Sequence, residues 1–210
     1  MTSKVCGATA GDVVDHTPGT WQTTKQATCT EEGEESTACT ICGETITRAV
    51  DKIPHNVEEW ELVKEATFSE TGERVKKCTE CGEVVNHEEY NLTEKEQVQW
   101  LKNNCQTGMY DAVSRDPNEY KGTYVKFKCK IVQVCSEAKS AGHLSEYRGA
   151  TSGSYDNVAY LFIDNYVKSR ILEDDKITIY GQFDGLLTYT TVLGASVTIP
   201  KIIVLYYEQS

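Results

Sequence analysis

The sequence of 210 residues lacks an apolar run long enough to span a bilayer, and its first residues lack the apolar segment of a secretory signal peptide. It also lacks a P-loop, a dinucleotide-binding fingerprint and a nucleophile elbow. These absences favour a protein without enzymatic activity, either cytosolic or a mature or trimmed form of a longer chain.

Positive charge is scarce in the N-terminal half of the chain. Residues 1–91 contain 8 Lys and Arg against 18 Asp and Glu, whereas residues 92–210 contain 13 against 14. An acidic segment repels a phosphate backbone, so this imbalance argues against nucleic acid as a partner of the N-terminal half.

Large apolar side chains are also scarce in this half, but the sequence repeats itself there at a constant offset of 39 residues. The matching pairs include His16 and His55, Trp21 and Trp60, Lys25 and Lys64, Cys39 and Cys78, and Cys42 and Cys81. Such a register indicates two copies of one small unit. About forty residues with so few apolar side chains cannot fold alone, so a metal ion or a disulfide must stabilise each copy.

The cysteine spacing favours metal in both copies. Each contains a C-x-x-C-G motif, and such a turn supplies two of the four ligands of a tetrahedral zinc ion. In the first copy Cys29, Cys39 and Cys42 offer three thiolates. The repeat pattern offers His16 as the fourth ligand, with Cys6 as a competitor, and we predict a Zn²⁺ site from this set.

The second copy has Phe68 where the first has Cys29, but His87 follows its C-x-x-C motif. We therefore predict a second Zn²⁺ site from His55, Cys78, Cys81 and His87. A three-ligand site with a bound water is one alternative. Disulfides are another alternative for both copies, although the nine cysteines cannot all pair within one chain.

Each copy is expected to form a short β-ribbon that begins at Trp21 or Trp60. We expect Gly33 and Gly72 to provide positive φ in the following turn, and the glycine after each second cysteine to close the metal-binding turn. Cys6 is followed by glycine like the end of a still earlier motif, which suggests that the chain begins within an array.

A helix is predicted after the repeats. Thr93 and Glu96 have the spacing of a capping box, and Val98, Leu101 and Cys105 then form an apolar helical face.

Beyond residue 120 the apolar residues alternate with polar ones, which predicts β-strands. The alternation changes phase near Ile131 and Val132, which indicates a β-bulge. Five strands, with a short connection between the third and the fourth, are typical of a five-stranded OB-fold barrel. The predicted strands cover residues 125–134, 143–151, 157–164, 176–183 and 196–208.

Some barrel residues could bind a ligand, because proteins that bind single-stranded nucleic acid combine cations with stacking aromatic rings. The candidates are Lys126, Lys128, Arg148, Tyr147 and Tyr160. The nearly neutral charge of residues 92–210 favours the alternative that the lysines are solvated and the aromatic rings fill the barrel.

Two resemblances add to this interpretation. The pattern H…W…A-T-C-T-x-x-G…C-x-x-C-G over residues 16–82 resembles modules that occur in arrays on proteins of Gram-positive, mainly clostridial, bacteria. This implies spacer or adhesive repeats attached to another domain. The motifs D-P-N-E-Y-K-G at 116–122, R-I-L-E-D-D-K at 170–176 and T-I-P at 198–200 resemble a bacterial OB-fold family named for its likeness to tRNA anticodon-binding domains. That resemblance implies an OB fold in a secreted or lipid-anchored protein.

The sequence thus predicts a mainly β protein with two small zinc-ribbon-like repeats, a short helical segment and a five-stranded OB-fold barrel. The expected segments are a remnant of a preceding repeat (1–15), two repeats (16–54 and 55–91), a helical linker (92–119) and the barrel (120–210). We expect a non-enzymatic binding protein whose acidic, zinc-stapled arm presents the barrel to a protein, peptide or glycan partner at the bacterial cell envelope or outside the cell. The alternative is a cytosolic zinc-ribbon and OB protein that binds single-stranded nucleic acid.

Overall fold

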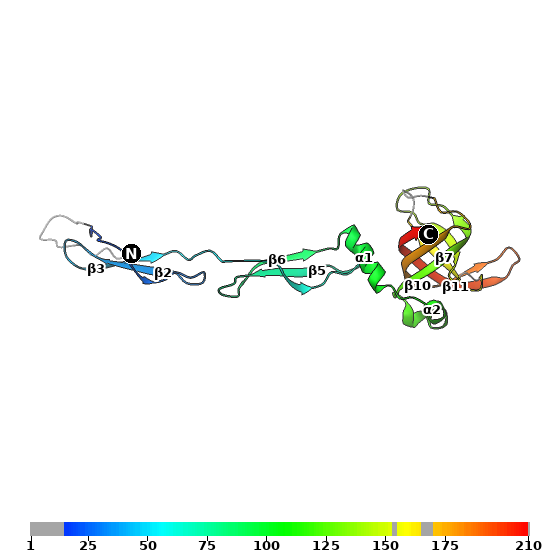
Figure 1. The fold of residues 1–210 in the computed structure, drawn as a ribbon, viewed down its shortest axis with the longest axis horizontal. Coiled ribbons are helices and arrows are strands. Elements are labelled where there is room, and N and C mark those ends of the chain that lie inside the picture. The colour runs from blue at the N-terminus through cyan, green and yellow to red at the C-terminus, as the bar shows by residue number, and fades with distance from the viewer. Residues whose placement is uncertain (1–14, 153–154, 165–169, 210) are drawn as a thin grey trace. The chain divides into compact units, whose positions relative to one another are not determined.

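A computed structural model describes residues 15–152, 155–164 and 170–209 (Figure 1). The chain divides into two compact units, one formed by residues 1–66 and 71–91 and the other by residues 67–70 and 92–210. Most of the predicted remnant over residues 1–15, including Cys6, lies outside the described residues. In the described part of the chain, each helix is too short or too polar to cross a membrane.

The first unit contains two three-stranded antiparallel sheets, which confirms the prediction of small β repeats. In each sheet the middle strand pairs with both of its neighbours. The first sheet has the order β1 (Gln22–Lys25), β2 (Gly33–Ala38) and β3 (Thr45–Val50), and the second has β4 (Glu61–Lys64), β5 (Gly72–Lys77) and β6 (Val84–Tyr90).

An arginine covers the tryptophan of each repeat in place of a large apolar core. The guanidinium of Arg48 lies 4.3 Å from the centroid of the Trp21 ring and donates to Glu35. Arg74 lies 4.9 Å from the Trp60 ring in the second repeat, but it comes from the middle strand and not from the last one. These contacts contribute little, about 0.5–1 kcal/mol each at exposed sites, so the repeats still need another source of stability.

The glycines of the repeats have two different roles. Gly43 and Gly82, which follow the second cysteine of each motif, close the tight turns that were predicted, and they have φ of +73° and +76°. The prediction of positive φ at Gly33 and Gly72 was wrong, since neither is among the residues with positive φ. A Cβ on Gly33 would lie 2.7 Å from the backbone nitrogen of Ala27, so close approach of two backbones requires this glycine.

The second unit begins with the predicted helix, α1 (Glu94–Asn104). Its capping box is confirmed, because the backbone N–H of Glu96 donates to the Thr93 hydroxyl and the backbone N–H of Thr93 donates to the Glu96 carboxylate. Leu101 is buried on the apolar face. Two short helices follow, α2 (Tyr110–Arg115) and α3 (Pro117–Tyr120).

Five strands then form a mixed sheet that closes on itself. The strands are β7 (Tyr124–Ser136), β8 (Ser145–Ala150), β9 (Val158–Ile163), β10 (Lys176–Thr190) and β11 (Ser196–Gln209). Their order is β10-β11-β9-β8-β7, and β7 also pairs with β10, which closes a barrel. The β9–β11 pair is parallel and the others are antiparallel. The predicted bulge is present, because the β7–β8 register shifts between Ile131 and Gln133.

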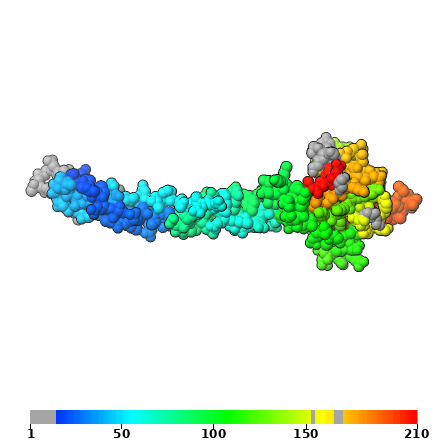
Figure 2. Space-filling model, in the orientation of Figure 1, coloured from blue at the N-terminus to red at the C-terminus, as the bar shows by residue number. Residues whose placement is uncertain are grey.

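The barrel interior holds the core of the second unit. Among its fully buried side chains are Val125, Ile131, Tyr147, Leu161, Ile179, Phe183 and Ile202. Strands β10 and β11 continue beyond this core as a hairpin, drawn in orange in Figures 1 and 2. At the hairpin tip, Val192 and Leu193 are almost completely exposed.

Candidate metal centres

Backbone hydrogen bonds shape both C-x-x-C turns in the same way. In the first repeat the N–H of Gly43 donates to the Cys39 carbonyl over 2.9 Å, and the N–H of Cys39 donates to the Glu44 carbonyl over 2.8 Å. The counterparts 39 residues later make the same two bonds at 2.9 and 2.8 Å. The two cysteine thiols of each motif are therefore held on one tight turn.

A second backbone contact brings a histidine to each turn. The N–H of Thr40 donates to the Thr17 carbonyl over 2.9 Å, which fixes the residue before it, His16, beside the turn. The Nδ1 atom of His16 lies 3.6 Å from the Cys42 Sγ atom. In the second repeat the Nδ1 atom of His55 lies 3.5 Å from the sulfur of the matching cysteine, Cys81.

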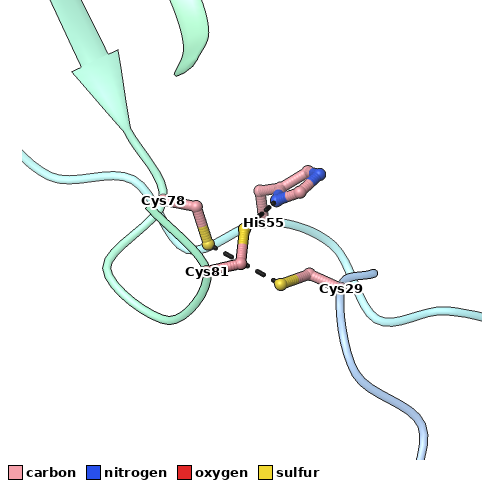
Figure 3. Close-up of side chains that lie close together, drawn as sticks. All are labelled: Cys29, His55, Cys78 and Cys81. Atoms are coloured by element: carbon pink, nitrogen blue, oxygen red, sulfur yellow. Dashed lines mark hydrogen bonds between the residues drawn. The ribbon is translucent and has the colours of Figure 1, made fainter. Parts of the chain in front are cut away.

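Cys29 lies in the turn between β1 and β2 of the first repeat, yet its thiol reaches the second repeat. The N–H of Glu31 donates to the Thr28 hydroxyl, and the N–H of Ile53 donates to the Thr28 carbonyl over 3.2 Å, which ties this turn to the segment just before the second histidine. The Sγ atoms of Cys29 and Cys78 are 3.8 Å apart (Figure 3). The resulting cluster, with all ligand atoms within 4.8 Å of one another, consists of Cys29, His55, Cys78 and Cys81.

The distances within this cluster fit a tetrahedral zinc ion. Zn–S bonds of about 2.3 Å and Zn–N bonds of about 2.0–2.1 Å place two sulfur ligands about 3.8 Å apart and a sulfur and a nitrogen ligand about 3.6 Å apart. The structure has 3.8 Å between Cys29 and Cys78 and 3.5 Å between Cys81 and His55. An S–S bond would be only about 2.05 Å long, so Cys29 and Cys78 are separate thiols close enough to share one metal ion.

Each histidine also faces a carboxylate with its second ring nitrogen. The Nε2 atom of His16 lies 3.7 Å from the Glu44 carboxylate, and that of His55 lies 3.7 Å from the Glu83 carboxylate. A carboxylate behind a histidine ligand commonly fixes its ring orientation and tautomer. Both rings therefore direct Nδ1 toward the cysteines.

The local environment shifts the pKa values of three cysteine thiols in the two clusters. The backbone N–H of Cys42 lowers the pKa of Cys39 to about 5, and that of Cys81 lowers the pKa of Cys78 to about 6. Burial raises the pKa of Cys29 to about 11. One thiolate per turn is therefore favoured at neutral pH without a metal, whereas Cys29 would have to lose its proton to act as a ligand.

The predicted grouping of the ligands is corrected in two places. Cys29 belongs to the second cluster, and the first cluster contains His16, Cys39 and Cys42. His87 lies outside both clusters. It sits on β6, a strand that leads away from the turn, and its Nε2 atom is 3.8 Å from the Glu73 carboxylate.

Phe68 is the sequence signal that could have revealed the correct grouping. Its turn keeps the hydrogen bonds of the first-repeat turn, with the N–H of Thr67 donating to the Glu70 carbonyl, but has no cysteine. If the turn cysteine bound a metal within its own repeat, the second repeat would need a cysteine where it has Phe68. In the second unit, to which Phe68 belongs, its ring lies edge-on to that of Tyr124, with 6.3 Å between the centroids.

The predicted ligand-binding residues of the barrel are separated into different places. Tyr147 is completely buried. Because side chains alternate across β8, that of the next residue, Arg148, points to the other face of the strand. The burial of Tyr147 in the barrel core argues against a role for it in binding a ligand. Lys126 and Lys128 line a cavity of about 680 Å³ together with Asp111.

Arg148 and Tyr160 are cross-strand neighbours and belong to a partly buried group that we call the aromatic patch. Its members are Arg148, Tyr160, Phe162, Tyr189 and Lys201. The rings of Tyr160 and Phe162 are 5.4 Å apart, and the Arg148 guanidinium lies 4.4 Å from the Tyr189 ring. Burial and the hydrogen bond to a neighbouring carboxylate raise the pKa of Tyr160. The sequence prediction had omitted Tyr189 and Lys201.

Comparisons with protein families, with curated proteins and with solved structures find no match to this chain.

Proposed function

We propose that this chain is a non-enzymatic binding protein in which zinc joins two small β repeats and a barrel recognises the partner. The observation that carries the proposal is the cluster of Cys29, His55, Cys78 and Cys81, which takes one ligand from the first repeat and three from the second. Four nitrogen and sulfur ligands leave no open position for a substrate, so this set suits a structural metal and not a catalytic one.

The metal has a clear physical task in the first unit. The repeats bury few large side chains, and their arginine–tryptophan contacts are weak. A zinc ion held by both repeats supplies the missing stability and ties the Cys29 turn to the second metal-binding turn. We infer that the acidic repeats act as a spacer, in agreement with the resemblance to bacterial repeat modules.

The recognition role is assigned to the barrel. Its strand order and its parallel β9–β11 pair support the OB fold, in which the second and third strands and the loop between the last two strands form the binding face. The aromatic patch occupies this face, and the adjoining hairpin ends in the exposed Val192 and Leu193. Exposed apolar residues beside arginine and tyrosine are typical of protein interfaces, which favours a protein or peptide partner. A glycan partner and a location at the cell envelope are proposed from the resemblance to bacterial repeat modules.

The first test is to measure bound metal on protein purified without added zinc or chelator, together with a count of reactive thiols. We expect at least one zinc ion per chain, with the cluster thiols reactive only after unfolding in a chelator. Absence of metal, with these cysteines oxidised, would reject the zinc-joined arrangement.

The recognition role can be tested with isolated cell envelopes of a Gram-positive bacterium. We expect the wild-type chain to co-sediment with them and a Leu193→Asp variant, changed at an exposed tip that the core does not need, to bind at least about tenfold more weakly. Equal sedimentation of both proteins would exclude the hairpin from recognition, and no sedimentation would remove the envelope as the location of the partner.

The second candidate is binding of single-stranded nucleic acid, because the aromatic patch pairs stacking rings with Arg148 and Lys201. The nearly neutral charge of residues 92–210 argues against it. Fluorescence anisotropy with a labelled oligonucleotide separates the candidates, because a nucleic-acid protein binds more tightly as salt is lowered. Lack of binding at low salt would eliminate this second candidate.

A further inference from the structure

The three ligands of the first cluster correspond to three ligands of the second cluster, which also has a fourth. His16, Cys39 and Cys42 correspond, 39 residues apart, to the three second-repeat ligands. The supporting glutamates also correspond, and both histidine–glutamate distances are 3.7 Å. Among the residues that the structure describes, a thiol from a turn of another repeat is present in the second cluster alone, and that thiol is Cys29.

Within residues 15–152, 155–164 and 170–209, no fourth histidine, cysteine or carboxylate joins the first cluster. Its sulfur-to-nitrogen distance of 3.6 Å between Cys42 and His16 is nevertheless that of two ligands on one tetrahedral metal ion. The chemistry of the first cluster is therefore that of a metal site with one open position.

The surroundings of the open position are also those of a contact surface. Beside the second cluster, the Cys29 turn borders a cavity of about 630 Å³ that is also lined by Ile53, Asn56 and Cys81. Beside the first cluster, Ile41 within the C-x-x-C turn has 68% of its surface exposed. The counterpart of Ile41, 39 residues later, is Glu80, which lines the cavity at the second cluster, so the same position beside the first cluster is available to a turn of another repeat.

We propose that the cluster of His16, Cys39 and Cys42 binds a metal ion whose fourth ligand is a cysteine thiolate on a turn of another repeat. The partner has the chemistry of the Thr28–Glu31 turn, a cysteine flanked by threonines and followed by glutamate. The metal thus joins this repeat to a further one, as the second cluster joins the two repeats described here. This inference rests on the proposed function, because it extends the same kind of metal joint.

The test uses the full chain, cobalt as a spectroscopic substitute for zinc, and a synthetic peptide of residues 24–35 as the partner. The first equivalent of Co²⁺ should fill the second cluster and show three thiolate ligands. The second equivalent should show two thiolates, and millimolar peptide should raise its thiolate-to-cobalt absorption about 1.5-fold, as expected for a third thiolate.

Two controls accompany this experiment. The same peptide with Cys29→Ser should leave the spectrum unchanged, because a serine hydroxyl does not replace a thiolate on cobalt. A chain with Cys42→Ser should lose the response to the peptide but keep the spectrum of the first equivalent, since that substitution leaves the second cluster intact.

Two results would overturn the inference. One is an unchanged second-equivalent spectrum at millimolar cysteine peptide. The other is a three-thiolate spectrum at the first cluster without peptide that a Cys6→Ser substitution abolishes, since the ligand would then come from this chain. A first equivalent without three thiolates would instead refute the proposed zinc-joined repeats, so the two failures can be told apart.

Discussion

Replacing Cys29 by serine removes one metal ligand and leaves every other side chain of both clusters in place. The second cluster then has the same three ligands as the first. Substitution of a residue that only hydrogen-bonds a metal ligand typically lowers metal affinity about 10–100-fold. Loss of a ligand itself should therefore lower zinc affinity by more than about 100-fold.

The effect on stability follows from linkage between binding and folding. In a zinc buffer set at about 100 times the wild-type dissociation constant, the metal stabilises the folded state by about 2.7 kcal/mol. A site that binds about 100-fold more weakly keeps only about 0.4 kcal/mol of this. Because 1 kcal/mol shifts the midpoint of a domain of this size by about 4–8 °C, the first unit should unfold about 9–18 °C lower.

Scanning calorimetry of both proteins in the zinc buffer and in a chelator measures this difference. We expect the drop in zinc and nearly equal midpoints in the chelator, and a Cys105→Ser variant should leave the first-unit transition unchanged because Cys105 belongs to the second unit. An equal drop in both buffers would mean that Cys29 acts only through packing. No drop in either buffer would refute its role as a ligand.

Three further expectations concern other parts of the molecule. A Glu83→Gln variant should bind zinc about 10–100-fold more weakly in a competition titration, because its histidine loses an orienting carboxylate. Without metal, the first unit should gain stability from about pH 6 to pH 9 in thermal unfolding, because the pKa values of Cys39 and Cys78, about 5 and 6, lie below the value of 9.0 for an unperturbed thiol. Gly181→Ala should destabilise the barrel by about 1–3 kcal/mol in urea, because its Cβ would lie 2.5 Å from the Ile203 carbonyl oxygen.

Each expectation has an outcome that contradicts it. Unchanged zinc affinity in the Glu83→Gln variant would show that the exposed carboxylate does not orient the ring. A metal-free stability that stays flat or falls between pH 6 and pH 9 would show that the folded state does not favour the thiolates, since the unfolded chain binds more protons in that range. An unchanged urea midpoint for Gly181→Ala would mean that the β10–β11 pair can shift to admit a methyl group.

Local patterns predicted much of the fold because each depends on neighbours in the sequence. The capping box of Thr93 and Glu96 and the bulge after Ile131 are set by short-range geometry, and both are confirmed. The close approach at Gly33 depends on how the chain returns past Ala27, which spacing does not reveal. A glycine at position 33 was therefore explained by positive φ, whereas the structure requires it for close backbone approach.

The candidate site was predicted correctly in its residue types but not in its grouping. The C-x-x-C turns and the histidines recur at a fixed offset, so their association is local to each repeat. Cys29 acts across the boundary between repeats, and a sequence read one repeat at a time assigns it to its own repeat. His87 failed as a ligand because a strand carries it away from the turn, which the count of residues after Cys81 did not show.

Because Cys29 lies between β1 and β2, the second Cys/His cluster is complete only when a turn of the first repeat is in place. Its thiol is in place only while the first repeat is folded, so unfolding of that repeat opens the neighbouring site. With the proposed metal bound, much of the interface energy between the two neighbouring repeats would come from one metal–sulfur bond. A single substitution at this cysteine should therefore weaken the coupling between the repeats while leaving each sheet its own hydrogen bonds.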